Sequence, residues 1–298
     1  MSAPVLDIAD LHVAIGGGRR GAPIPLLRGV DLTVAAGEVR GLVGESGAGK
    51  SMIARSIFGL LPGGARITRG RVLFEGRDLA SMPDHERRAL LGAEIALIPQ
   101  DPMTSLNPVK PIGEQIGTVL RLKMNLDRKA ARERSLELLA EVAIRDPARV
   151  LELYPHELSG GMRQRILIAI AFSCAPRLVI ADEPTTALDV TVQRQILRLI
   201  HDLQHRLGSA VLFVTHNFGL VAKLCQSVTV LYAGRVMEDG ATEAVLAEPR
   251  HAYTSALLAA TPRLDRPADA LAPLPRTLIE TLLSEAHAYD EANRAAYA

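Results

Sequence analysis

The chain has few of the residues that build disulfide frameworks and aromatic binding surfaces. Its 298 residues include two cysteines, no tryptophan and 3% aromatic residues. Cys174 and Cys225 do not form a C-x-x-C pair, which argues against a local metal or redox motif. Each lies in an apolar stretch of an expected helix. We therefore interpret both as reduced core thiols, the state typical of a cytoplasmic protein.

Long apolar runs and blocks of one charge are also missing. The longest apolar stretch, residues 166 to 175, is too short to cross a bilayer. The first residues include Asp7 and Asp10 and no basic region, so no secretory signal is evident. A net charge of +1 without a long basic block gives no support to nucleic-acid binding. Any membrane function is expected to depend on partner chains.

A glycine-rich loop is the most informative segment that is present. It follows a strand pattern at 39–43 and precedes a helical pattern at 52–60, the context that a phosphate-binding P-loop requires. Glycines let successive N–H groups turn toward a triphosphate, and the helix start adds a positive end. Lys50 is expected to reach the β and γ phosphates and Ser51 to ligate Mg²⁺. A glycine turn before an ordinary helix is the alternative for this loop taken alone. The expected ATP-binding residues are Gly44, Glu45, Ser46, Gly47, Ala48, Gly49, Lys50 and Ser51.

An apolar run at 178–182 ends in a pair of carboxylates, Asp182 and Glu183. A buried parallel strand would deliver both acids to its carboxyl edge. There Asp182 is expected to hold Mg²⁺, commonly through water, and Glu183 to polarise an attacking water. Without the P-loop, the same pair would be interpreted as a helix cap and a solvated neighbour.

The segment Leu158–Arg165, L-S-G-G-M-R-Q-R, resembles the signature sequence of the ATP-binding-cassette (ABC) family and precedes the acidic strand as it does there. The serine is expected to cap the helix that follows, leaving a hydroxyl and free N–H groups facing outward. The resemblance implies that these groups meet the γ-phosphate of ATP on a second subunit's P-loop. The residues concerned are Ser159, Gly160, Gly161 and Gln164.

Three further residues match the family, and two of them, Gln100 and His216, end expected strands. Gln100 stands where ABC ATPases carry the glutamine that senses Mg²⁺ and links the site to the transmembrane partner. His216 matches the switch histidine that contacts the γ-phosphate, and Asp189 belongs to a segment resembling the D-loop of the dimer interface. The resemblance implies catalytic roles for Glu183, His216 and Gln100, and metal contacts for Ser51, Gln100 and Asp182.

The first strand departs from the family pattern. Many members stack adenine on an aromatic residue there, but this chain has Ile15 at that position. An aliphatic contact with adenine remains possible, yet the stacking contribution is lost, so selectivity for adenine is expected to be weaker. His12, in the same strand, is interpreted as part of its solvated face.

The expected fold is α/β, a P-loop NTPase of the ABC-ATPase type with a RecA-like core. Strand patterns at 1–40 and 66–78 predict an antiparallel β subdomain. Helical patterns between about 101 and 165 predict a helical subdomain carrying the signature, and strands and helices alternate from 166 to 240. We expect an ABC ATPase domain over 1–262, then a Pro/Ala-rich linker and a helix at 277–297 within 263–298.

Residues 100–108, 113–115 and 248–262 resemble ATPase subunits of the peptide/nickel importers, although Ala252 replaces the usual proline. The resemblance implies ATP and Mg²⁺, a second ABC ATPase that is identical or homologous, two permease subunits and an extracytoplasmic solute-binding protein. It places the chain peripherally on the cytoplasmic face of the inner membrane, with no nucleic acid. Because residues 263–298 contain no cysteine, the iron–sulphur cluster found in some members is excluded there.

The solute stays open among peptides, nickel chelates, glutathione, opines and oligosaccharides. Two other classes of protein compete with the importer. Non-transport ABC proteins of DNA repair, chromosome structure or translation usually show paired cassettes, long coiled coils or zinc-binding cysteines, and none is visible here. A P-loop kinase or GTPase would leave residues 158–165 unexplained. We therefore expect the ATP-hydrolysing subunit of an ABC solute importer.

Overall fold

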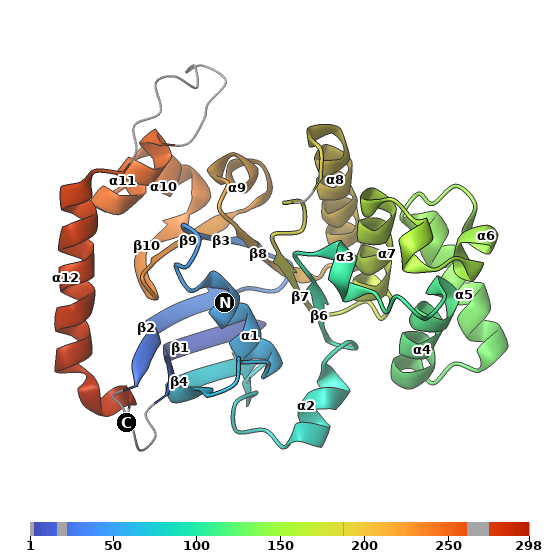
Figure 1. Cartoon of the computed structure of the whole chain (residues 1–298), viewed down its shortest axis with the longest axis horizontal. Coiled ribbons are helices and arrows are strands. Elements are labelled where there is room, and N and C mark those ends of the chain that lie inside the picture. Colours follow the sequence, from blue (N-terminus) through green and yellow to red (C-terminus); the bar gives the residue numbers. More distant parts are fainter. Residues whose placement is uncertain (1–2, 17–22, 187, 261–273, 298) are drawn as a thin grey trace. The chain divides into compact units, whose positions relative to one another are not determined.

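The computed structural model describes residues 3–16, 23–186, 188–260 and 274–297. The chain forms two compact units, one made of residues 1–82 and 212–298 and the other of residues 83–211 (Figure 1). The C-terminal helix belongs to the first unit, and the expected domain boundary at 262 stays a prediction. The second unit extends beyond the expected helical subdomain at both ends.

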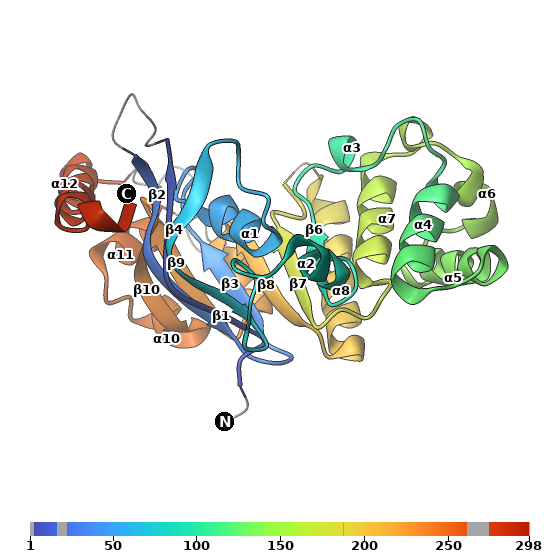
Figure 2. The ribbon, with the colours of Figure 1, turned by 90° about the horizontal axis from the view of Figure 1, so that it is seen from below.

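The first unit contains the predicted antiparallel sheet. Its strands are β1 (Leu6–Ile15), β2 (Ile24–Val34), β4 (Ala65–Phe74) and β5 (Arg77–Asp78), in the order β2-β1-β4-β5. Figure 2 labels β1, β2 and β4 of this sheet. Glu75 and Gly76 form the tight β4–β5 turn, with φ values of 47° and 78°. Two successive positive φ values are the geometry that a two-residue hairpin turn requires.

A bulge in β1 changes which side chains are buried. Asp10 has a φ of 49°, and the register with β2 shifts between Ile8 and Leu11. Beyond the bulge, residues 11–14 are all buried, so the simple alternation of a strand is lost. His12 is fully buried, and its expected place on a solvated face is wrong.

The C-terminal helix explains this burial. Helix α12 (Arg276–Ala292) packs against β2, and the 3₁₀ turn η3 (Arg294–Tyr297) follows it. The Tyr289 and Tyr297 rings lie 6.1 Å and 5.3 Å from the His12 ring, centroid to centroid. The helix predicted at 277–297 is confirmed over most of its length. Most of the expected linker before it lies outside the described residues.

The first unit also holds most of a mixed sheet. Strand β3 (Val39–Val43) is buried along its whole length and pairs in parallel with β9 (Ser227–Tyr232), which pairs antiparallel with β10 (Arg235–Ala241). Strand β8 (Ala210–Thr215) runs across the boundary of the two units. The helices of this part are α1 (Lys50–Phe58), α9 (Phe218–Leu224), α10 (Thr242–Ala247) and α11 (Ala252–Ala259).

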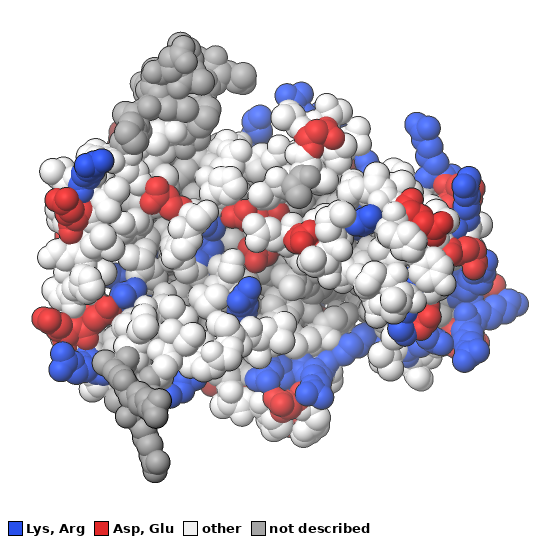
Figure 3. All heavy atoms as spheres, viewed as in Figure 1, with Lys and Arg blue, Asp and Glu red and all other residues white. Residues whose placement is uncertain are grey.

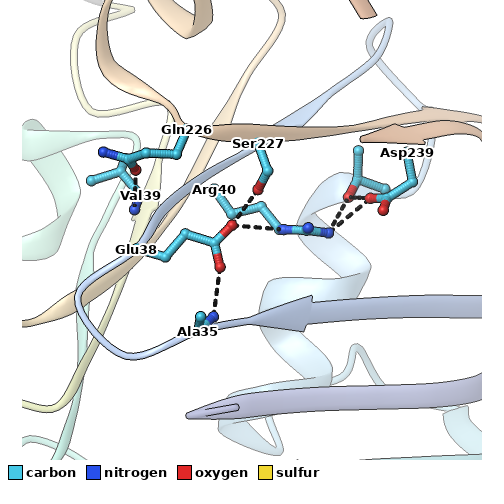
Figure 4. Close-up of polar contacts among 8 residues, drawn as sticks. Ala35, Glu38, Val39, Arg40, Gln226, Ser227 and Asp239 are labelled. Atoms are coloured by element: carbon cyan, nitrogen blue, oxygen red, sulfur yellow. Dashed lines mark hydrogen bonds and ion pairs between the residues drawn. The ribbon is translucent and has the colours of Figure 1, made fainter. Parts of the chain in front are cut away.

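A charged network fastens the start of β3 to its neighbours (Figure 4). Arg40 donates from Nη1 to Asp239 Oδ1 at 2.7 Å and to Thr229 Oγ1 at 3.2 Å. Glu38 lies beside Arg40 and accepts a hydrogen bond from the Ser227 hydroxyl. Because a buried guanidinium is costly without partners, these bonds hold the strand that leads into the glycine loop.

The second unit is built on two parallel strands, β6 (Ile95–Ile98) and β7 (Leu178–Asp182), in which Ile98 lies opposite Ala181. Helices surround them, and α4 to α7 gather as the predicted helical region (Figure 1). Acidic and basic side chains are interspersed over this region (Figure 3), as in the ion pairs of Arg134 with Glu137 and Glu141. The helices are α2 (Asp84–Leu90), α3 (Pro102–Ser105), α4 (Ile112–Met124), α5 (Arg128–Glu141), α6 (Pro147–Glu152), η1 (Pro155–Glu157), α7 (Gly160–Phe172) and α8 (Val190–Leu207).

Both cysteines lie just beyond helix ends rather than within helices, which corrects the expectation. Cys225 is buried after α9, and burial, with the nearby charge of Glu38, raises the pKa of its thiol to about 12. Cys174 is only half-buried after α7. None of the described helices combines the length and apolar character that crossing a membrane requires.

Candidate functional site

The glycine loop joins β3 to α1 in a backbone shape that side chains would obstruct. Gly47 and Gly49 have φ values of 83° and 107°, in the left-handed range that favours glycine. A Cβ on Gly44 would lie 2.2 Å from the carbonyl oxygen of Leu231. Glycine is therefore required at these three positions for the loop to keep this shape against β9.

The Lys50 side chain bonds back to the start of the glycine loop. It is buried, and Nζ donates to the carbonyl oxygens of Gly44 at 2.8 Å and Glu45 at 2.9 Å. These bonds use loop carbonyls rather than loop N–H groups. Helix α1 begins at Lys50, so its positive end lies at the loop. The loop therefore has the charge and donors to hold a triphosphate.

A cavity of about 780 Å³ opens beside this loop in the first unit. His216 is exposed directly after β8 and lines it, as its place at a strand end predicted. Asn217, which sequence reasoning missed, also lines it and caps α9 by accepting from Gly219 N at 2.8 Å. A polar residue directly after a buried strand was the available signal. The full lining is Gly44, Glu45, Ser46, His216, Asn217, Leu257 and Ala260.

The carboxyl edge of the second unit brings a glutamine and a glutamate together. Gln100 Nε2 donates to Glu183 Oε2 at 3.1 Å, and Thr186 Oγ1 donates to the same oxygen at 2.9 Å. The contact follows from topology, because β6 and β7 are parallel and each residue comes shortly after its strand. Glu183 has a φ of 45°, a conformation that is strained for a non-glycine residue and recurs at functional sites.

The predicted metal-binding residues offer oxygen atoms of the kinds that Mg²⁺ prefers. Asp182 contributes a half-buried carboxylate at the end of β7, and Gln100 an amide oxygen in the same unit. Ser51, in the first turn of α1, contributes a hydroxyl in the first unit. Each of these oxygens is a ligand of a kind that Mg²⁺ accepts, and their expected contact with one metal ion stays a prediction.

The signature segment starts a helix as predicted. Ser159 is exposed and caps α7, accepting from Met162 N at 3.3 Å. A Cβ on Gly161 would lie 3.0 Å from Val192 Cγ1, so this glycine also lets α7 pack closely on α8. The expected contact of Gln164 with ATP on a second subunit stays a prediction. Gln164 is fully buried, one turn before the buried Ile168, because this side of α7 faces the core.

Two remaining site residues have the predicted local structure. Asp189 caps α8, accepting from Thr191 N at 3.0 Å and Val192 N at 2.9 Å. Ile15 ends β1 half-buried between Ile24 of β2 and Ala65 of β4. Their expected contacts with a second subunit and with adenine stay predictions.

Similarity to known proteins agrees with this geometry. The family model "ABC transporter" matches residues 27–186, and "Oligopeptide/dipeptide transporter, C-terminal region" matches residues 237–285. The "Dipeptide transport ATP-binding protein DppD" of Bacillus subtilis is 45% identical over 274 residues, 92% of this chain and 81% of that protein. The "Probable peptide ABC transporter ATP-binding protein y4tR" of Sinorhizobium fredii is 49% identical, covering 87% of this chain and 77% of its own length.

Solved structures agree on the fold. The "Dimeric structure of a post-hydrolysis state of the ATP-binding cassette MJ0796 bound to ADP and Pi" superposes with a TM-score of 0.70 at 26% identity, covering 80% of this chain and 98% of that one. The cbiO1 subunit of Clostridium perfringens superposes with a TM-score of 0.68 at the same 26% identity. Glycine loop, acidic strand and capped signature helix thus occur together on a cassette fold, and the chain belongs to the ABC transporter family.

Proposed function

We propose that this chain is the ATP-hydrolysing subunit of an ABC importer for peptides or closely related small solutes. The observation that carries the proposal is the Glu183 carboxylate, which follows Asp182 at the end of β7 and is oriented by Gln100 and Thr186. A carboxylate held in this way is suited to accept a proton from, or orient, an attacking water.

Each part of the site has one task in this reaction. The N–H groups at the start of α1 and the Lys50 ammonium bind the phosphates of ATP. Mg²⁺, held through Ser51, Asp182 and Gln100, would neutralise charge on the transferred phosphoryl group. The two donors to Glu183 Oε2 fix the carboxylate, so that its orientation does not have to be found during the reaction. His216, beside the loop, would contact the γ-phosphate side of the nucleotide.

A second cassette would complete the site. The exposed Ser159 hydroxyl and the N-terminus of α7 form a donor group suited to phosphate, and Asp189 lies in the expected interface segment. The solved relative described as dimeric and bound to ADP and Pi supports this arrangement. The remaining expected partners are two permease subunits and a solute-binding protein, with the chain peripheral at the cytoplasmic face of the inner membrane.

The solute class rests on relatives rather than on residues of this chain. Similar proteins carry names for dipeptide, D,D-dipeptide and oligopeptide transport, and their C-terminal region matches at 237–285. Peptides are therefore the proposed solutes, and selection among them would belong to the binding protein and permeases.

Two substitutions test the catalytic assignment by separating binding from hydrolysis. Glu183→Gln should reduce ATP turnover by about 100-fold or more, because an amide is a far weaker base, while ATP still binds and holds two cassettes together. Lys50→Ala should instead lose ATP affinity, because its charge acts on bound ATP and on the transition state alike. ATPase rates, nucleotide titrations and sedimentation measure these effects, with Glu280→Gln on the exposed side of α12 as the matched control. Ordinary turnover by Glu183→Gln would refute the catalytic role.

A further inference from the structure

The C-terminal helices are linked to the nucleotide loop by two paths within the first unit. Helix α12 is linked to it indirectly, through an ion pair with β2 and the β9–β10 turn, and α11 contacts it directly. Tyr253 lies 208 residues after the loop residue that it contacts, and Asp290 lies 262 residues after its ion-pair partner. Neither is among the residues that the proposed reaction uses.

The first path begins with a two-fold ion pair. Arg28 of β2 donates from Nε to Asp290 Oδ1 at 2.7 Å and from Nη2 to Asp290 Oδ2 at 2.9 Å. The two side chains are only 14% and 19% exposed. Nη1 of the same guanidinium donates to the carbonyl oxygen of Ala233 at 2.6 Å. Asp290 therefore orients the Arg28 guanidinium, which binds the β9–β10 turn through the carbonyl oxygen of Ala233. The two parallel bonds to Asp290 use the fork geometry that favours arginine over lysine.

The β9–β10 turn is itself bonded to the nucleotide loop through a backbone hydrogen bond. Gly234 N donates to the carbonyl oxygen of Ala48 at 2.8 Å, and Arg28 N donates to the carbonyl oxygen of Gly234 at 2.8 Å. Ala233 and Gly234 have φ values of 46° and 74°, and a Cβ on Gly234 would lie 2.3 Å from Leu26 O. The turn fits tightly against β2, so a shift of Arg28 would move the support of Ala48.

The second path is direct. The Tyr253 hydroxyl accepts a hydrogen bond from Glu45 N at 3.4 Å, and the tyrosine is fully buried. Its ring packs against Tyr232 with centroids 4.6 Å apart. The start of α11 is fixed as well, because His251 Nδ1 accepts from Tyr253 N at 3.1 Å. Burial raises the pKa of the Tyr253 hydroxyl, so it stays neutral at ordinary pH.

We propose that Tyr253 and Asp290 are positioning residues that hold the nucleotide loop in its ATP-binding shape, so that the C-terminal helices set the affinity for ATP. The inference rests on the proposed role of the loop in binding the phosphates. A loop that is already held in the bound shape loses less conformational freedom when ATP binds, so the free-energy cost of binding is lower. Loss of this support weakens ground state and transition state together, and so raises KM while kcat stays constant.

The test compares Tyr253→Phe and Asp290→Asn in the full-length chain, at a temperature where circular dichroism shows every variant folded. Each should raise the KM and Kd for ATP about three- to ten-fold, the usual effect of losing one such bond, with kcat within about two-fold. Phenylalanine keeps the ring contact with Tyr232, and asparagine keeps the shape of Asp290. Glu285→Gln, an exposed carboxylate on α12, is the control and should leave both constants unchanged.

A double-substitution cycle identifies the path. Arg28→Ala with Asp290→Asn should have the same KM as Arg28→Ala alone, because both act through one guanidinium, whereas Tyr253→Phe with Asp290→Asn should multiply their effects. Unchanged KM and Kd in both single variants, with only a lower melting temperature, would overturn the inference and leave the helices a purely structural role. Retained ATP affinity in Lys50→Ala would instead refute the proposed role of the loop, so the two failures are distinguishable.

Discussion

Glu183 is held in a left-handed backbone conformation, φ 45°, which costs a non-glycine residue roughly 1–3 kcal/mol. Two side-chain donors, Gln100 and Thr186, meet its carboxylate there. Glycine supplies similar freedom in the P-loop, where Gly44 leaves no room for a Cβ beside Leu231. At the scale of single residues, the site therefore depends on backbone geometry as much as on the reactive groups.

Ile15 offers a gain-of-function prediction at the same scale. If adenine lies against this half-buried side chain, Ile15→Tyr should tighten ATP binding by up to about 1 kcal/mol through stacking. The preference for ATP over GTP should sharpen with it. Parallel titrations with both nucleotides measure the effect, and Leu122→Tyr, at a position that is 76% exposed in the second unit, is the control. No change in either affinity would show that Ile15 is not the adenine platform.

At the scale of elements, a carboxylate on strand β10 fixes the start of helix α11. Glu238 of β10 accepts from Arg250 N at 2.8 Å and from His251 N at 3.1 Å. Burial alone would raise the pKa of Glu238, but these hydrogen bonds to its charged form lower it. The same helix carries Tyr253, so Glu238 also sets the position of the second path to the loop.

A fall in pH should therefore weaken the attachment of α11 to β10. Because the pKa of Glu238 is lower in the folded state than in the unfolded state, its stabilising contribution is complete above the unfolded value of about 4.5 and is lost as pH falls through the folded value. Melting temperatures from pH 7 to pH 3 should fall less steeply for Glu238→Gln than for the parent. Equal slopes in the two proteins would contradict the assignment, and Glu280→Gln should follow the parent.

At the scale of the whole molecule, the second unit presents the segment after Gln100 to solvent. Residues 102–105 of this segment form the short helix α3, capped by Asp101. Its side chains Met103 and Ser105 are exposed. The Gln115 amide then ties the chain that follows, donating to Asn107 O at 3.0 Å and to Lys110 O at 2.8 Å. The surface is thus fixed and accessible, as a docking role for a permease requires.

Ser105→Arg tests that role. A bulky charge on the exposed end of α3 should leave the basal ATPase of the isolated subunit intact, because the Ser105 hydroxyl donates to the carbonyl oxygen of Asp101 rather than to Gln100 or Glu183. ATP hydrolysis stimulated by solute in the permease complex should fall together with uptake. Reconstituted vesicles measure both, with Ser284→Arg on the exposed side of α12 as the control. Normal uptake would argue against α3 as the coupling surface.

Local pattern predicted much of the fold and of the site. Strands 39–43 and 178–182 have the predicted bounds, because buried parallel strands leave strong apolar signals. The cap of α7 by Ser159 was predicted as well. Parallel pairing then made the meeting of Gln100 with Glu183 predictable from strand ends alone.

The sequence by itself determined the family motifs, the order of the elements and the chemistry available at each strand end. Only the tertiary structure decided that His12 and Gln164 are buried, and that Asp290 and Tyr253 support the nucleotide loop. The bulge at Asp10 and the packing of α12 bury residues of β1 that strand alternation alone would leave exposed. Neither feature can be predicted from the local sequence pattern. Contacts between residues more than 200 positions apart leave no periodic trace, because periodicity reports one face of one element and not what packs against it.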